Sequence, residues 1–254
     1  MGVLESVIEF LQFEMKEPDL YGWFHLLCLG IMIVLIALLS LLKIETRKLL
    51  LVFSLVMITL ELYKQLSFSH HNGVWEYQWY AFPFQFCSVP MYAALIAAIT
   101  KNRKVEQALL CFLATYGLVA GIAVMAYPST VFISETLINV QTMIHHGFMV
   151  VMGMHLIISR KVTFGLKTIL NAACVFVILV IIALLANIIT YHAGIDGGLE
   201  LFYISPYHSP ILPVFSVIYE KAPYVVLLLS YVIIFTVGSM LPLFISRLFL
   251  KKSK

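Results

Sequence analysis

Five ionisable or nucleophilic residues lie inside segments of this chain that are otherwise apolar. They are Glu61, Lys64, Cys87, His145 and His146. A charged side chain near the middle of a bilayer costs about 2.5–3.5 kcal/mol on insertion scales, so such residues are rare without a partner or a function. Their presence indicates a buried polar site.

Cys87 and the histidine pair are residue types that together perform nucleophilic catalysis. A thiol near its ordinary pKa is mostly protonated at neutral pH, and a nearby imidazole can take that proton to give a reactive thiolate. The amides of Gln85 and Gln141 are candidate donors to the oxyanion that forms when a thiolate attacks an ester. The combination favours a membrane acyltransferase or a related lipid hydrolase, and a site within the membrane suits the acyl ester of a phospholipid.

The polar residues around the histidine pair recur at helical spacing. Asn139, Thr142 and His146 form one stripe, and Gln141 and His145 form the neighbouring one. A stripe of small and polar groups faces other helices, not lipid. We therefore take His146 as the candidate base, with His145 as its alternative or as a substrate contact. On these residues alone, a core histidine hydrogen-bonded between helices is the commoner situation.

A second polar group surrounds the cysteine. Pro90 cannot donate to the carbonyl of Phe86, so a helix that ran through it would kink and leave that carbonyl free. With Gln85, Cys87 and Ser88, the free carbonyl would form the polar mouth of a pocket. The other interpretation is a proline kink beside a buried cysteine.

Glu61 and Lys64 are three residues apart and therefore close enough to pair on one helix. Such a pair can simply offset the cost of its own burial. It can also line the site and hold a lipid headgroup, and we include both residues among the candidate substrate contacts.

The composition places the chain among integral membrane proteins. Hydrophobic residues make up 62% of the 254 positions and charged residues only 11%, whereas soluble domains are about 45–50% apolar. The net charge of +3 gives no reason to expect a nucleic-acid partner. The four cysteines have no metal-ligand spacing, so we expect no disulfide, metal or other cofactor. Haem held by two histidines is disfavoured, because no partner helix carries a second pair of histidines at the same depth in the membrane.

The apolar segments predict an all-α, polytopic membrane bundle of seven transmembrane helices in a single domain, 1–254. A span needs about 20 mostly apolar residues. The predicted spans are Gly22–Leu42, Leu49–Phe68, Ala81–Thr100, Glu106–Ala126, Thr136–Ser159, Gly165–Thr190 and Pro223–Phe249.

The basic residues predict the orientation of the bundle. Of the 16 lysines and arginines, thirteen lie in the tail and in the connections on its side of the membrane, and three lie on the other side. Lysine and arginine are enriched on the cytoplasmic side. We therefore expect the N-terminus outside and the C-terminus inside.

Two segments outside the spans complete the predicted outer face. Residues 1–20 have the amphipathic pattern of an interfacial helix. The 191–222 loop is long and rich in aromatic residues, so we expect a packed lid, with Tyr203, Tyr207 and His208 as candidate headgroup contacts.

Several of these motifs, in this order and spacing, resemble the YwaF-like integral membrane proteins, which include the transmembrane protein 164 acyltransferases. The resemblance is carried by Phe84-Gln85-Phe86-Cys87-Ser88 with Pro90, by Ala114-Thr115-Tyr116-Gly117-Leu118 with Tyr127-Pro128-Ser129, and by Asn139, Gln141, Thr142 and His146-Gly147.

The resemblance implies an enzyme of the cell membrane that moves acyl chains between phospholipids and lysophospholipids without a soluble acyl donor. It implies that Cys87 is the nucleophile and that His146, the histidine before glycine, is its base. The alternative function is a transporter for ions or small solutes with Glu61, Lys64 and the histidines along its path. The chain shows no inverted repeat that would favour transport.

Overall fold

The computed structural model describes residues 2–250 apart from 43, 72 and 196–197. Its fold is all-α, with 73% of residues in helices. The helices are α1 (Val3–Leu11), α2 (Trp23–Leu41), α3 (Thr46–Ser69), α4 (Val89–Ile99), α5 (Arg103–Phe112), α6 (Leu118–Ala126), α7 (Thr136–Ile158), α8 (Leu166–His192), α9 (Pro213–Lys221), α10 (Tyr224–Ser239) and α11 (Leu241–Leu250). Strands β1 (His70–His71) and β2 (Val74–Trp75) form a short antiparallel hairpin.

Five helices in the described ranges are long and apolar enough to cross a membrane. They are α2, α3, the continuous α5–α6 helix, α8, and the α10–α11 helix as far as Arg247. A π-helical segment, Leu113–Gly117, joins α5 to α6. The prediction of a helical membrane protein is therefore confirmed, whereas the count of seven spans and the orientation stay predictions.

Helix α4 is shorter than the predicted third span. It begins at Val89 and ends at Ile99, so its 11 residues extend about 16 Å, roughly half of a bilayer core of about 30 Å. The predicted kink at Pro90 is wrong, because Pro90 lies in the first turn of α4. The first turn needs no N–H donor to a preceding carbonyl, so proline begins this helix without distorting it.

Helix α7 lies at the centre of the bundle and packs against α2, α3 and α6. Sixteen of its 23 residues are buried. A helix enclosed by other helices has little contact with lipid, so it tolerates polar side chains that a lipid-facing helix excludes. This position explains how α7 carries both histidines of the candidate site.

Two glycines allow α6 and α7 to pack closely. A Cβ atom at Gly121 would lie 2.9 Å from the backbone oxygen of His146, and one at Gly153 would lie 2.7 Å from the Cβ of Leu118. Any larger residue would therefore separate the helices. The close contact fixes α7 at the level of His146.

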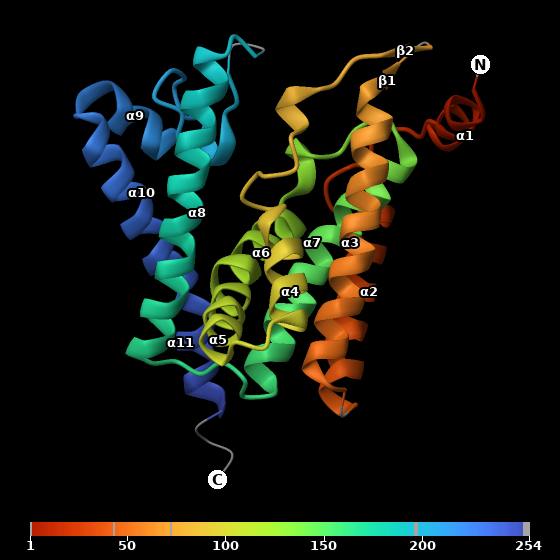
Figure 1. Ribbon diagram of the computed structural model, residues 1–254. Helices are drawn as coiled ribbons and strands as arrows, with labels where there is room; N and C mark the ends of the chain where they lie inside the picture. The colour runs from red at the N-terminus through yellow and green to blue at the C-terminus, as the bar shows by residue number, and fades with distance from the viewer. Residues whose placement is uncertain (1, 43, 72, 196–197, 251–254) are drawn as a thin grey trace.

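The N- and C-termini lie at opposite ends of the bundle (Figure 1). We call them the N-terminal end, which carries α1, β1, β2 and α9, and the C-terminal end, where α2 passes to α3, α4 to α5, and α7 to α8. The basic connections that predict the orientation lie at the C-terminal end.

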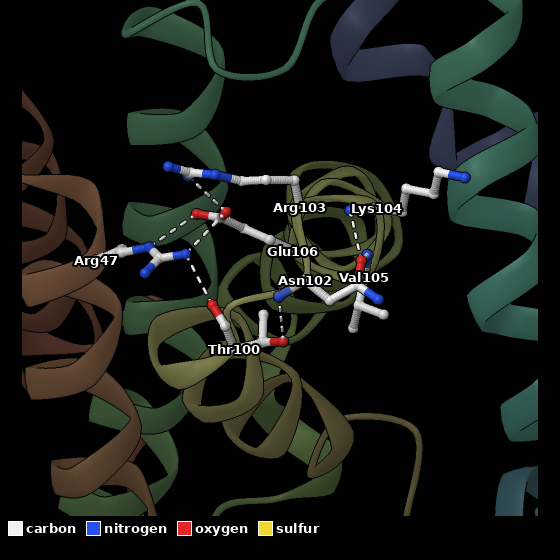
Figure 2. A network of polar contacts seen from close by, with 7 residues as sticks. All are labelled: Arg47, Thr100, Asn102, Arg103, Lys104, Val105 and Glu106. Atoms are coloured by element: carbon white, nitrogen blue, oxygen red, sulfur yellow. Dashed lines mark hydrogen bonds and ion pairs between the residues drawn. The ribbon is translucent and has the colours of Figure 1, made fainter.

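An ion-pair network joins three elements at the C-terminal end (Figure 2). Arg47 of α3 binds Glu106 of α5 through Nε, at 3.0 Å from Oε1, and through Nη2, at 2.9 Å from Oε2. The same Nη2 donates to the Thr100 carbonyl at 2.8 Å, and Arg103 binds Glu106 at 2.9 Å. Asn102 caps α5 by accepting from two backbone N–H groups. The network fixes the C-terminal end of the short helix α4.

The N-terminal end has two distinct additions to the bundle. Helix α1 covers nine residues of the predicted 1–20 segment, and its Val3 and Phe10 are 84% and 80% exposed. The 191–222 segment contains a 3-10 turn, Leu201–Tyr203, followed by α9. Its stretch from 199 to 205 is largely buried against the bundle, so this part of the predicted lid is packed.

Candidate functional site

A cavity of about 330 Å³ lies between α3, α7 and the start of α4. Seven of the nine predicted site residues line it, namely Glu61, Lys64, Cys87, Ser88, Gln141, His145 and His146. The remaining lining residues are Phe68, Tyr80, Thr130, Val131, Ile133, Ile138 and Thr142. The structure thus brings together groups that are up to 85 positions apart in the chain, counting from Glu61 to His146.

Hydrogen bonds to Glu135, just before α7, tie α3 to α7 at the N-terminal end. The hydroxyl of Tyr63 donates to Glu135 Oε1 at 2.7 Å, and that of Ser67 donates to the same oxygen at 2.8 Å. These contacts set the spacing of the two helices that form most of the cavity wall.

Cys87 lies in the irregular segment that precedes α4, next to the N-cap residue Ser88. Its side chain is partly buried and lines the cavity. The first turn of a helix presents N–H groups without intrahelical partners and a positive partial charge. Cys87 lies immediately before the N-cap residue Ser88, so its segment adjoins the positive end of α4.

The backbone fixes the orientation and tautomer of His145. Its Nε2 lies 2.9 Å from the carbonyl oxygen of Cys87. Because a carbonyl oxygen only accepts, Nε2 carries the proton and Nδ1 keeps a lone pair in the neutral ring. Nδ1 is buried and has no hydrogen-bond partner among the described residues. His145 thus anchors the segment that carries the cysteine.

His146 has the opposite tautomer. Its Nδ1 lies 2.8 Å from the carbonyl oxygen of Thr142, one turn earlier in α7, so Nδ1 carries the proton and Nε2 holds the lone pair. Nε2 is buried and has no partner in the described part of the chain. The imidazole is 6% exposed. His146 therefore lines the cavity with a ring held in one orientation and one nitrogen that keeps a free lone pair.

Glu61 and Lys64 form the predicted ion pair, with Lys64 Nζ at 2.7 Å from Glu61 Oε1. Gln65 also donates to Oε1, at 2.8 Å. The other carboxylate oxygen, Oε2, is buried without a partner in the described residues. Burying an unpaired charged oxygen is unfavourable, so within the described residues the pair leaves one acceptor of a cavity-lining residue unsatisfied.

Two predicted site residues lie outside the cavity lining. Asn139 accepts from the N–H of Ile133 at 3.0 Å and donates to its carbonyl at 2.7 Å, so it holds the connection before α7. Gln85 binds the backbone of Glu200 and Phe202. Both amides therefore bind backbone, and only Gln141 remains as a side-chain amide in the cavity.

Sequence reasoning missed one residue that supports the site and part of the cavity wall. Gln65 does not line the cavity but binds Glu61, and its position four residues later on a helix is the signal that could have found it. Tyr80 and the 130–133 connection carry no comparable signal, because they reach the cavity only through the fold of two loops.

Taken together, the fold and the cavity define a polytopic membrane protein with a thiol and two imidazoles around a buried polar pocket. The model of the TMEM164 family matches residues 20–244, which is most of the chain. The chain therefore belongs to the TMEM164 family. No curated protein and no solved structure matches it significantly.

Proposed function

We propose that this protein is an acyltransferase of the cell membrane that moves fatty acyl chains between phospholipids and lysophospholipids through Cys87 and His146. The observation that carries the proposal is the shared cavity, which Cys87 and His146 both line, together with the buried Nε2 of His146, which has no partner among the described residues. Membership of the TMEM164 family supports it.

In the first half-reaction, His146 Nε2 takes the thiol proton and the Cys87 sulfur attacks the ester carbonyl of a phospholipid. The carbon–sulfur bond forms, and the ester carbon–oxygen bond breaks. The departing lysophospholipid oxygen receives the proton from the imidazolium. The products are an acyl-cysteine thioester and a lysophospholipid, with His146 neutral again.

In the second half-reaction, a different lysophospholipid enters the cavity. Its hydroxyl gives a proton to His146 Nε2 while its oxygen attacks the thioester. The new ester bond forms, the carbon–sulfur bond breaks, and the thiolate regains the proton. The proposed acceptor is a lysophospholipid and not water, because a lysophospholipid arrives from the bilayer itself.

The negative charge that develops in both steps needs hydrogen-bond donors or positive charge nearby. The N-terminus of α4 supplies a positive partial charge beside Cys87. Gln141 lines the cavity, and its amide N–H₂ is a candidate donor, while its Oε1 accepts only a long hydrogen bond of 3.4 Å from Thr142. Lys64 contributes a full positive charge to the same cavity.

The aromatic rim of the cavity suits entry from the lipid side. Phe68 and Tyr80 are in ring contact, with centroids 6.1 Å apart, and Tyr80 is 66% exposed. Amphipathic rings of this kind concentrate at the interface of a bilayer. Helix α1, with its exposed apolar face, would lie on the same interface.

The test is acyl transfer by purified protein in mixed micelles that contain a phospholipid with an isotope-labelled acyl chain and an unlabelled lysophospholipid. Wild-type protein should form the labelled phospholipid product and a mass-detectable acyl adduct on Cys87. Cys87→Ala should form neither, while Cys111→Ala, a buried cysteine that does not line the cavity, should form both. Undiminished transfer by Cys87→Ala would refute the covalent mechanism.

A further inference from the structure

Gln85 binds a distant part of the chain with both ends of its side-chain amide. Its Nε2 donates to the carbonyl of Glu200 at 3.2 Å, and its Oε1 accepts from the N–H of Phe202 at 3.1 Å. The amide thus pairs with the backbone of residues 200–202 as a neighbouring β-strand would, by donating to a carbonyl and accepting from an N–H group. Two hydrogen bonds through one planar group fix both the distance and the orientation of the Gln85 amide relative to the 200–202 backbone.

Asn187 holds the same segment from α8. Its Nδ2 donates to the carbonyl of Leu201 at 3.0 Å, and its Oδ1 accepts from the Leu201 N–H at 2.8 Å. Asn187 and Leu201 are almost fully buried. The 200–202 segment is therefore anchored to the bundle independently of Gln85.

The backbone next to these contacts is strained. Phe202 and Tyr203 have φ angles of 59° and 55°, in the left-handed region that residues other than glycine rarely adopt. Such conformations persist when the surrounding contacts over-determine them. The ring of Phe202 is fully buried and lies 5.5 Å from that of Phe86 and 6.2 Å from that of Phe84, measured between centroids. The 200–202 segment is thus held by Asn187 and packs against aromatic rings of the segment that carries the cysteine.

The segment that carries the cysteine is held by short backbone turns, in which the N–H groups of Ser88 and Val89 donate to the Gln85 carbonyl at 2.8 and 3.3 Å, and by ring contacts of Phe86. Residues 82–88 form neither helix nor strand. The Tyr92 hydroxyl holds the carbonyl of Pro83 at 3.0 Å, and His145 holds that of Cys87 at 2.9 Å. Between Pro83 and Cys87, the side chain of Gln85 joins this segment to the backbone of residues 200–202, two positions before the nucleophile.

We propose that Gln85 is a positioning residue that fixes Cys87 in the cavity by clamping its segment to the anchored 200–202 backbone. This inference rests on the proposed function, because it assigns Gln85 a part in the reaction of Cys87. Gln85 acts through the backbone, without touching the substrate, which differs from a role as an oxyanion donor.

The first test is the kinetics of acyl transfer by Gln85→Met, which keeps the side-chain length and removes both hydrogen bonds. We expect kcat to fall about 10²-fold with KM unchanged, since misplacement of a reacting group by about 1 Å has effects of this size. Gln107→Met is the matched control, because Gln107 makes its contacts to Cys111 and Lys161 away from the cavity. It should retain wild-type kcat. A rise in KM alone would instead indicate substrate contact by Gln85.

The second test does not depend on acyl transfer. In a chain with alanine at Cys28, Cys111 and Cys174, Cys87 is the single thiol, and its alkylation by a membrane-permeant maleimide is timed by mass spectrometry. Gln85→Met should alkylate about tenfold faster, because a freed segment exposes the partly buried thiol. Gln85→Glu, which keeps the size and sets a carboxylate against the Glu200 carbonyl, should do the same.

Asn187→Leu separates positioning from general stability. It removes the other clamp on the 200–202 segment, so it should lower the unfolding temperature at least as much as Gln85→Met while changing alkylation of Cys87 less. Equal alkylation in Gln85→Met, Asn187→Leu and the parent would overturn the proposal. If the parent protein transferred no acyl chains, the proposed function would fail, and alkylation would still decide the role of Gln85.

Discussion

Two glutamates, the partly buried Glu106 and the buried Glu61, form ion pairs at opposite ends of the bundle. At the C-terminal end, both oxygens of Glu106 are bound, one by Arg47 alone and the other by Arg47 and Arg103. At the N-terminal end, one oxygen of Glu61 is bound by Lys64 and Gln65, and the other has no partner among the described residues. The same kind of residue is thus fully satisfied in one place and half satisfied in the other.

The difference distinguishes a structural contact from a candidate site. Native proteins pair nearly all their buried polar atoms, because an unpaired one costs about 1–3 kcal/mol. The cavity concentrates three unpaired acceptors, which are Glu61 Oε2, His145 Nδ1 and His146 Nε2. A ligand with hydrogen-bond donors, such as a hydroxyl group, would satisfy them. At the C-terminal end, both carboxylate oxygens of Glu106 already have partners, so this glutamate offers a ligand no unpaired acceptor.

The largest expected effect comes from removing the unpaired nitrogen of His146. His146→Ala should reduce acyl transfer about 10²–10⁴-fold, which is the usual contribution of a general acid–base residue. Adding Cys87→Ala should cause little further loss, because the two residues act as a unit. Initial rates in mixed micelles would measure both.

The control for His146 lies on the same helix. His155 is near the C-terminal end of α7, where its Nε2 is paired with the hydroxyl of Thr46 at 3.2 Å. His155→Gln should therefore keep wild-type transfer rates. If His146→Ala and His155→Gln lost equal amounts of acyl-transfer activity, the distinction between a candidate site at the N-terminal end and a structural contact at the C-terminal end would be contradicted.

A large effect on stability is expected from the half-satisfied glutamate. Glu61→Gln leaves the Lys64 ammonium, which is 18% exposed, without its counter-ion. Removing one partner of a buried pair destabilises proteins by about 3–5 kcal/mol, and the partial exposure of Lys64 places the expected loss near the lower figure, about 3 kcal/mol. Denaturant unfolding in detergent micelles would measure the free energy of unfolding.

The double variant Glu61→Gln with Lys64→Met separates stability from function at this pair. It removes both charges, so most of the lost stability should return, whereas acyl transfer should stay reduced if the pair contacts the substrate. Recovery of both would show that the pair is structural only.

A smaller effect is expected at the C-terminal end. Glu106→Gln should lower the free energy of unfolding by about 1–2 kcal/mol, because hydrogen bonds to charged groups are lost while the exposure of both arginines weakens the pairs. The rate of acyl transfer per folded molecule should not change. A drop in that rate at unchanged stability would link this network to the reaction.

The smallest effect is expected from Thr142→Val. The carbonyl of Thr142, and not its hydroxyl, fixes the tautomer of His146. Replacing the hydroxyl by a methyl group of similar size should change transfer rates less than about twofold, since the partner that sets the tautomer is retained. A large loss would show that the hydroxyl itself takes part, by contact with substrate or by orienting Gln141.

Much of the candidate site could be predicted from the sequence, because its residues are polar or charged within segments that are otherwise apolar. Glu61, Lys64 and the histidine pair are conspicuous in apolar helices, and helical periodicity placed each on a face. Gln85 was equally conspicuous, but its proximity to Cys87 suggested the cavity, whereas its amide binds the 200–202 backbone. Residue type alone does not say in which direction a loop side chain points.

The sequence by itself determined that this is a helical membrane protein and which polar residues its apolar segments carry, since burial in lipid requires apolar side chains and internally satisfied backbone. Only the tertiary structure decided that α4 begins at Val89, that Cys87 precedes it, and that the two histidines have opposite tautomers. The physical reason is that helix periodicity is a local property of the chain. The start of a helix at a proline and the partner of an imidazole depend on contacts between segments, and these contacts form only when the bundle is assembled.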